Sequence, residues 1–174
     1  MANFNLAFGF DWNSKPRFGP SSFAQLQLCL TEILEPERER IAGLFGEIQE
    51  RDTLEVSIVD ITGDNALVLE LITACVVFSG AERSQSKIAS PLNERYIAGA
   101  SPILSEKFGY RDSCAYKVEN APTWLLAQED VLHSGTFAFS AVILVYEPAS
   151  GELRNFIVDP EMQVDPFEEK RNRA

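Results

Sequence analysis

The stretch that decides the fold is 136–159, TFAFSAVILVYEPASGELRNFIVD. Between positions 136 and 146 both alternating sets of side chains are largely apolar, which predicts a central strand covered on both faces. The turn residues EPASG at 147–151 interrupt this run, and residues 152–159 then resume an extended pattern. The stretch therefore predicts a β-hairpin.

A second hairpin is predicted over about 53–78. Residues 53–61 alternate as a strand does, and the sequence TGDN at 62–65 is a strong turn signal. The run ALVLELITACVVF at 66–78 is apolar enough for a buried helix, but its β-branched residues favour a strand that pairs with the previous one.

An amphipathic helix is predicted at about 36–50. Pro36 suits the first helical position, and nearby glutamates are favoured by the helix dipole. Four apolar side chains then recur at the spacing of one helix face: Ile41, Leu44, Phe45 and Ile48. We expect this helix to pack on the sheet with an acidic outer face.

Several shorter helices are also expected. Residues 22–34 are ambiguous, since a capping-box pair and a helical spacing favour a helix, whereas alternation within the segment favours an edge strand. The intrinsic preference of Gln and Leu favours the helix. Three further short helices, each closed by a glycine, are predicted at 90–99, 101–109 and 123–133.

Together these elements predict an α+β fold, with a mixed or mainly antiparallel sheet packed against the helix at 36–50 and the short helices. Strands and helices do not alternate regularly, which disfavours a doubly wound fold. A chain of 174 residues suits one domain, predicted here over 1–158. An acidic tail with two Asp-Pro pairs follows at 159–174, and we expect it to be either extended or docked on a partner.

The chain is acidic, with a formal net charge of −11 and a pI of about 4.5. Residues 32–55 carry eight acids against three bases, and residues 147–169 carry seven acids against one base. This composition disfavours direct binding to a nucleic-acid backbone, which needs clustered Lys and Arg. It also disfavours anionic membrane surfaces.

The clustered acids predict a non-catalytic module that binds another protein, with a basic surface, through complementary charge. An immunity protein or antitoxin, a chaperone and an assembly protein would all fit this description. The predicted partner-binding residues are Glu35, Glu39, Glu47, Glu50, Asp159, Glu161, Asp165, Phe167, Glu168 and Glu169. A solvated helix face and a frayed tail would explain the same acids without a partner. A further alternative is a structural subunit that contacts its neighbours through the tail, with Met162 and Phe167 as apolar anchors.

Catalytic options are narrow, because His133 is the single histidine. The alternative hypothesis of a small enzyme pairs Cys114 with His133, oriented by Asp130 or Glu129. Cys114 also suits a buried core thiol, and His133 suits a helix C-terminus. The sequence therefore favours a protein without catalytic residues or a cofactor.

No metal site is expected. The three cysteines are isolated, and the acidic turn at 60–65 lacks the spacing of a calcium loop. Widely spaced cysteines, no basic leader and no long apolar run predict a soluble protein in a reducing, cytoplasmic setting. The oligomeric state stays open.

Overall fold

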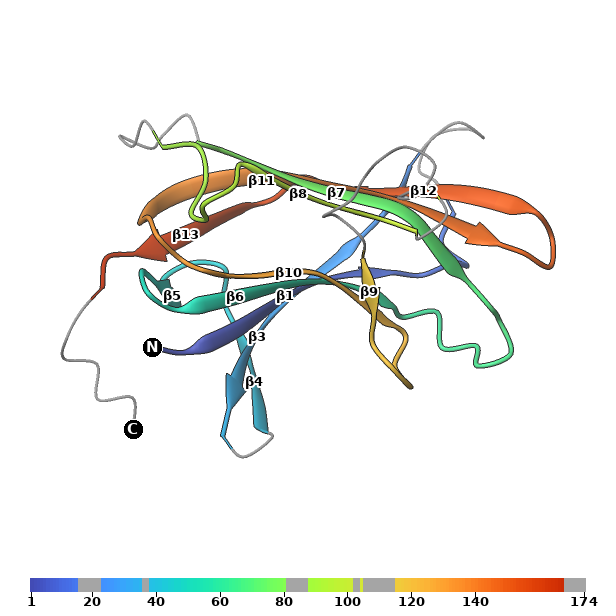
Figure 1. Ribbon diagram of the computed structural model, residues 1–174, viewed down its shortest axis with the longest axis horizontal. Coiled ribbons are helices and arrows are strands. Elements are labelled where there is room, and N and C mark those ends of the chain that lie inside the picture. Colours follow the sequence, from blue (N-terminus) through green and yellow to red (C-terminus); the bar gives the residue numbers. More distant parts are fainter. Residues whose placement is uncertain (16–22, 36–37, 81–87, 102–103, 105–114, 168–174) are drawn as a thin grey trace.

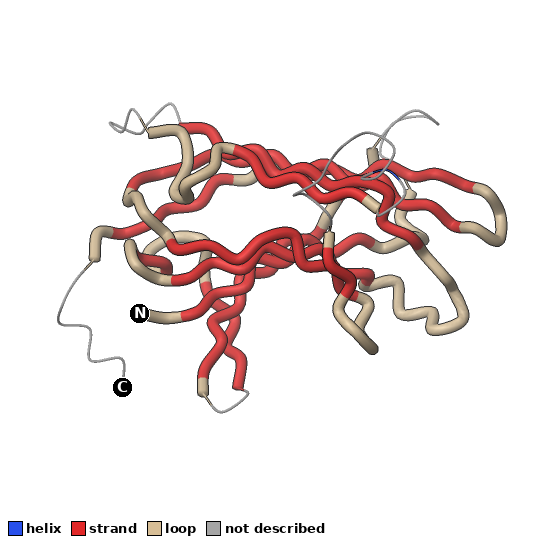
Figure 2. The backbone as a smooth tube through the Cα atoms, in the orientation of Figure 1, coloured by secondary structure: helices blue, strands red, loops and turns tan. Residues whose placement is uncertain are grey.

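Strands make up nearly all of the regular structure (Figures 1 and 2). The computed structural model describes residues 1–15, 23–35, 38–80, 88–101, 104 and 115–167. Thirteen strands in these residues form two mixed sheets, which lie face to face as a β-sandwich. The expected α+β class is therefore wrong, since Leu104 is the only described residue in a helical state.

Sheet A has six strands in the order β4-β3-β1-β6-β10-β9. They are β1 (Asn3–Phe10), β3 (Gln27–Leu34), β4 (Arg38–Ala42), β6 (Thr53–Asp60), β9 (Tyr116–Lys117) and β10 (Thr123–Asp130). β1 runs parallel to β6 and antiparallel to β3. In Figure 1 this sheet is the lower layer, and the β3–β4 hairpin extends below it.

Sheet B has seven strands and forms the upper layer of Figure 1. They are β2 (Ala24–Gln25), β5 (Ile48–Gln49), β7 (Glu70–Gly80), β8 (Tyr96–Ala100), β11 (Gly135–Glu147), β12 (Glu152–Val158) and β13 (Glu161–Asp165). β11 is the central strand: β7 pairs along one edge, and β12 and β13 share the other. β8 pairs with β7, β2 runs parallel to β12, and β5 runs parallel to β13.

Aromatic side chains join the two sheets. Phe8 of β1 meets Phe139 of β11 edge-on, with ring centroids 5.9 Å apart, and Phe78 of β7 lies 5.7 Å from Phe139. Phe10 of β1 packs on Phe156 of β12 at 5.4 Å. All five side chains are at most 1% exposed. Rings in such tilted contacts contribute packing energy beyond the area that they bury.

The hairpin predicted at 136–159 is confirmed by the antiparallel pairing of β11 with β12. Its turn needs Gly151, which has a φ of +73° and donates its N–H to the carbonyl of Glu147. The two faces of β11 differ, however. Ile143 on the inner face is fully buried, whereas Val142 on the outer face is 37% exposed.

The hairpin predicted at 53–78 does not form. The two strands exist, but β6 lies in sheet A beside β1 and β10, while β7 lies in sheet B beside β11 and β8. Residues 61–69 carry the chain from one layer to the other. A turn signal specifies that the chain changes direction, but it does not specify which sheet the next strand joins.

The amphipathic helix predicted at 36–50 is also wrong. β4, a turn and β5 occupy the described part of this segment, and Pro36 lies outside the described residues. Ile41 is 79% exposed and Phe45 is 56% exposed, so the apolar spacing does not form one buried face. Gly43 and Gly46 would each have weakened a helix by about 1 kcal/mol, and pairing with β3 stabilises the extended form instead.

The remaining expected helices are replaced by strands wherever the structure describes them. Residues 22–34 contain β2 and β3, and residues 123–133 contain β10. Residues 90–99 form bends that lead into β8, and most of 101–109 lies outside the described residues. Each strand gains ladder hydrogen bonds from a neighbour distant in sequence, which local helix propensity does not anticipate.

The aromatic contact between the sheets yields a stability prediction. Phe139→Ala should lower the free energy of unfolding by about 3–5 kcal/mol, because it leaves a cavity between Phe8 and Phe78. Urea unfolding would measure this loss as a lower midpoint at an unchanged slope. Leu153→Ala is the control: this side chain is 55% exposed, so its loss should change stability by less than about 0.5 kcal/mol. Equal effects of the two substitutions would contradict the packing described here.

Candidate functional site

The parallel pairing of β5 with β13 brings the two acidic segments of the sequence together. Val164 lies opposite Ile48 and Asp165 lies opposite Gln49. Backbone hydrogen bonds extend the contact at both ends of the pair, from Gln163 N to Leu44 O and from Glu50 N to Asp165 O. Carboxylates from 44–50 and from 161–165 therefore share one edge of sheet B.

Four of the predicted partner-binding residues form this acidic edge: Glu47, Glu50, Glu161 and Asp165. Glu161 is exposed, and the other three are half-buried. Asp165 accepts a hydrogen bond from the side chain of Gln163 at 2.8 Å, and Glu50 accepts one from the backbone N–H of Ser134 at 2.9 Å. These contacts hold part of the acidic edge in place.

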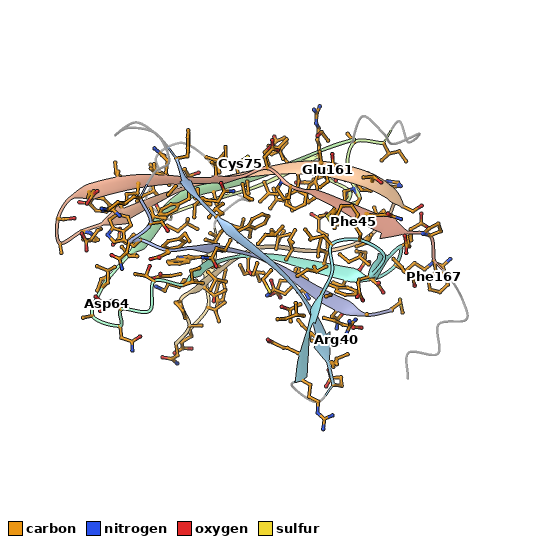
Figure 3. The ribbon with its side chains drawn as sticks, turned by 180° about the vertical axis from the view of Figure 1, so that it is seen from behind. Arg40, Phe45, Asp64, Cys75, Glu161 and Phe167 are labelled. Carbon is orange, nitrogen blue, oxygen red and sulfur yellow. The ribbon has the colours of Figure 1, made fainter. Side chains whose placement is uncertain are left out.

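An exposed aromatic ring accompanies the acids. Phe45 is 56% exposed and lies in the turn between β4 and β5. Gly46 allows this turn, since its φ is +74°, and the turn passes close to the Asp165 carboxylate. Figure 3 shows Phe45, Glu161 and Phe167 at the same end of the sandwich.

Phe167 is held against the body of the protein. The Arg51 guanidinium lies over its ring, 4.4 Å from the centroid, which is a cation–π arrangement. Met162, expected as a second apolar anchor, is fully buried in the core beside Phe137. Phe45 is therefore the exposed aromatic residue of this edge, although the sequence had suggested that it belonged to a buried helix face.

Arg40 links the acidic edge to sheet A. Its guanidinium forms ion pairs with Glu32 at 2.5 Å and with Glu47 at 2.9 Å. Hydrogen bonds to Glu47 and then to Glu32 raise the pKa of Arg40 above its ordinary value. Glu32 is only 4% exposed, so Arg40 supplies the positive charge for a buried carboxylate.

The other predicted partner-binding residues lie elsewhere or outside the described structure. Glu35 and Glu39 belong to the β3–β4 hairpin, which extends away from β13 (Figure 1). Asp159 follows β12 and accepts a hydrogen bond from Ser140 Oγ at 2.7 Å. Glu168 and Glu169 are not among the described residues.

The structure does not test the alternative catalytic group. Cys114 lies outside the described residues. His133 is half-buried, and its backbone N–H donates to the carbonyl of Pro91. Asp130 is exposed and accepts a hydrogen bond from Thr53 Oγ1 at 3.3 Å.

The acidic turn at 60–65 has a local structural role. Asp60 accepts a hydrogen bond from the N–H of Thr62, and Asp64 accepts one from the N–H of Ala66, both at 2.9 Å. These are Asx-type contacts, which stabilise turns. Over the described residues, no three His, Cys, Asp or Glu side chains are grouped as metal ligands.

A cleft of about 710 Å³ lies at the other end of the sandwich and was not anticipated from the sequence. Its walls are mainly apolar and include Leu71, Ala100 and Trp124. Lys117 lies 4.6 Å from the centroid of the Trp124 ring, and Glu70 also lines the cleft. Opposite charges at the same opening give no preference for the charge of a ligand.

Comparisons with protein-family models, with curated proteins and with solved structures find no match for this chain. No helix in the described ranges has the length and apolar character required to span a bilayer.

The contact between Arg40 and Glu32 yields a second prediction. Arg40→Met should destabilise the protein by about 1–3 kcal/mol, because the buried Glu32 carboxylate loses its charged donor. Arg38→Met removes the same charge from an exposed position on the same strand and should cost less than about 0.5 kcal/mol. Urea unfolding of the two variants gives the comparison. A stable Arg40→Met protein would show that Glu32 does not depend on this ion pair.

Proposed function

We propose that this protein is a non-catalytic binding module that uses its acidic edge to recognise a basic surface of another protein. The observation that carries the proposal is the pairing of β5 with β13, which joins two acidic segments that are distant in sequence. Such a module would act as an immunity, antitoxin-like, chaperone-like or assembly protein.

The range over which exposed charges interact supports this role. Adjacent strands lie about 4.8 Å apart, which is less than the Debye length of about 8 Å at physiological salt. The fields of Glu161 on β13 and of Glu50, which follows β5, therefore add, whereas Glu47 is paired with Arg40. A concentrated negative field accelerates the approach of a basic protein and orients it before contact.

Phe45 adds a short-range component to this recognition. Protein interfaces often centre on an aromatic side chain surrounded by polar residues, and the polar residues exclude water from the contact. The turn that carries Phe45 is bound to β13 through the hydrogen bond from Gln163 N to Leu44 O. Because this backbone is already ordered, little conformational entropy is lost when a partner covers the ring.

The proposed location of the protein is the cytoplasm. Cys29 and Cys75 are free thiols, and a reducing compartment keeps thiols in that form. A cytoplasmic module of this kind needs no cofactor, because its affinity comes from charge and from one aromatic contact.

The proposal predicts a salt-dependent complex that is sensitive to two carboxylates on β13. The immobilised protein would be incubated with native lysate at about 50 mM and about 500 mM salt, since salt at the higher level screens exposed charges. We expect a basic protein to be retained at low salt and released at high salt. Glu161→Gln with Asp165→Asn should weaken its binding at low salt by about 2- to 30-fold, as expected for the loss of one exposed and one half-buried carboxylate.

The matched control removes two carboxylates from the opposite end of the molecule. Asp64→Asn with Glu119→Gln gives the same change in net charge, and Figure 3 shows Asp64 far from Glu161. This control should bind as the unaltered protein does. A partner that is retained equally at both salt levels, or lost equally by both double variants, would contradict recognition through the acidic edge.

Phe45→Ala separates the aromatic contact from the charge. It should weaken the complex by a similar factor at each salt level at which binding is measurable, because burial of an apolar ring depends little on screening. Titration of the isolated partner over several salt concentrations provides the measurement. If Phe45→Ala changed only how steeply the affinity depends on salt concentration, and not the affinity itself, a direct role for the ring would be excluded.

A further inference from the structure

Two cavities share a wall at the end of the sandwich away from the acidic edge, where Figure 3 shows Asp64. The first is the cleft of about 710 Å³ described above, and the second is a smaller cavity of about 410 Å³. Four residues line both: Val68, Leu69, Lys117 and Trp124. Each volume lies within the range of about 300–1,000 Å³ that is typical of small-molecule sites. We call the larger one the apolar cleft and the smaller one the polar cavity.

Packed side chains of both sheets form the walls of the apolar cleft. Four of its lining residues are at most 6% exposed: Leu69, Leu71, Ala100 and Trp124. The Trp124 ring packs on Phe10 of β1, with centroids 6.1 Å apart. Beside the cleft, Gly99 lets β8 approach β10 closely, since a Cβ atom at position 99 would lie only 2.6 Å from Leu126 Cδ2. Walls that are already packed can bury an apolar group without rearrangement, which favours binding.

Two turns form the polar cavity, one at 60–66 and the other at 118–122. The backbone N–H of Asp60 donates to the carbonyl of Pro122 at 2.8 Å and joins the turns. Asp60 and Asp64 each accept one N–H within their own turn, which fixes the position of both carboxylates. Neither carboxylate takes part in the ion pairs found between described residues. Their charge is therefore available to a ligand.

The polar cavity changes the charge balance of the site. The apolar cleft alone has one charge of each sign, on Lys117 and Glu70. Asp60 and Asp64 add two carboxylates, so three carboxylates and one ammonium group line the two cavities among the described residues. A sphere of 410 Å³ is about 9 Å across, which is close to the Debye length of about 8 Å at physiological salt. Screening therefore leaves a negative potential inside the polar cavity.

We propose that the two cavities bind one small organic amine, with its protonated amino group in the polar cavity and an apolar ring in the apolar cleft. The carboxylates of Asp60 and Asp64 complement the positive charge, and the same carboxylates repel an anion. Aromatic rings pack favourably against an indole such as that of Trp124. The Lys117 ammonium lies 4.6 Å from the centroid of this indole, so the junction of the two cavities already accommodates a cation. This site does not involve the acidic edge, and each proposal can fail without the other.

The test is calorimetric titration of the full chain with three probes that share one ring and differ in charge: naphthylethylamine, naphthylethanol and naphthylacetate. We expect a dissociation constant below about 1 mM for the amine, a reasonable affinity for a ligand of this size. The amine should bind at least about threefold more tightly than the alcohol, and the acetate should bind most weakly. Raising the salt from about 50 mM to about 500 mM should weaken the amine and leave the alcohol unchanged.

Asp60→Asn with Asp64→Asn tests the charge of the polar cavity. Asparagine keeps the oxygen that accepts the N–H in each turn, so the turns should persist. This double variant should bind the amine no more tightly than the alcohol, while its affinity for the alcohol stays the same. Glu35→Gln with Glu39→Gln is the matched control, because it removes two exposed carboxylates from the β3–β4 hairpin. It should bind all three probes as the unaltered chain does.

Lys117→Met should have the opposite effect. Lys117 is exposed, so its replacement leaves the core intact, and methionine keeps an unbranched apolar side chain. Loss of the ammonium group should strengthen binding of the amine by at least about twofold and weaken binding of the acetate. Arg38→Met removes the same charge from β4 and should change neither affinity.

Val68→Trp tests whether the ring lies in the apolar cleft. Val68 lines both cavities and is 67% exposed, so a larger side chain there narrows the site without entering the core. It should weaken all three probes by at least about threefold. Ile41→Trp places the same side chain at a position that is 79% exposed on β4, and it should have no effect.

Three results would overturn the proposal. Failure of all three probes to bind at millimolar concentration would show that the two cavities do not accept a small ligand. Equal affinity for the three probes, or tightest binding of the acetate, would show that the carboxylates do not select the charge of the ligand. Amine binding that is unchanged by the Asp60 and Asp64 substitutions, or by Val68→Trp, would place the amine elsewhere on the protein.

Discussion

The double pairing of β11 is the constraint on which the rest of the structure depends. Its ladder with β7 occupies one edge, and its ladders with β12 and then β13 occupy the other. A strand that is paired on both sides leaves no backbone donor or acceptor for another structure. Every other strand of sheet B reaches the sheet through β11 or through a strand paired with it.

The acidic edge is a consequence of that arrangement. β11 is longer than β12, so its N-terminal part remains available after β12 ends, and β13 pairs there. β13 in turn offers its outer edge to β5, which leads directly into β6 of sheet A. Carboxylates that the sequence places in a presumed helix and in a presumed tail are thereby brought onto one edge by backbone pairing.

The same arrangement separates two kinds of surface. The end of the sandwich at β5 and β13 gathers carboxylates near an exposed Phe45, whereas the outward side chains of β11 from Thr136 to Tyr146 are all uncharged. Charged surfaces act over a distance and depend on salt, while neutral apolar surfaces act only on contact. The two surfaces therefore differ in the range of the forces that act at them and in the dependence of those forces on salt.

The local pattern of residues in the sequence determined only part of this structure. The hairpin at 136–159 was predictable because its apolar alternation, its turn and Gly151 all lie within one short stretch. The strands at 53–60 and 70–80 were predictable for the same reason, but their assignment to different sheets was not. The helix predicted at 36–50 failed because ladder hydrogen bonds to β3 outweighed a helical spacing of apolar residues.

The sequence by itself determined the alternating apolar core, the central hairpin and the two acidic segments, since each is a property of neighbouring residues. Only the tertiary structure decided that these acidic segments meet, that Phe45 is exposed and that one face of β11 lacks a covering layer among the described residues. Pairings such as β5 with β13 join residues that are distant along the chain. The free energy of such a pairing depends on how the whole sandwich packs. It therefore cannot be inferred from the local spacing of residues in the sequence.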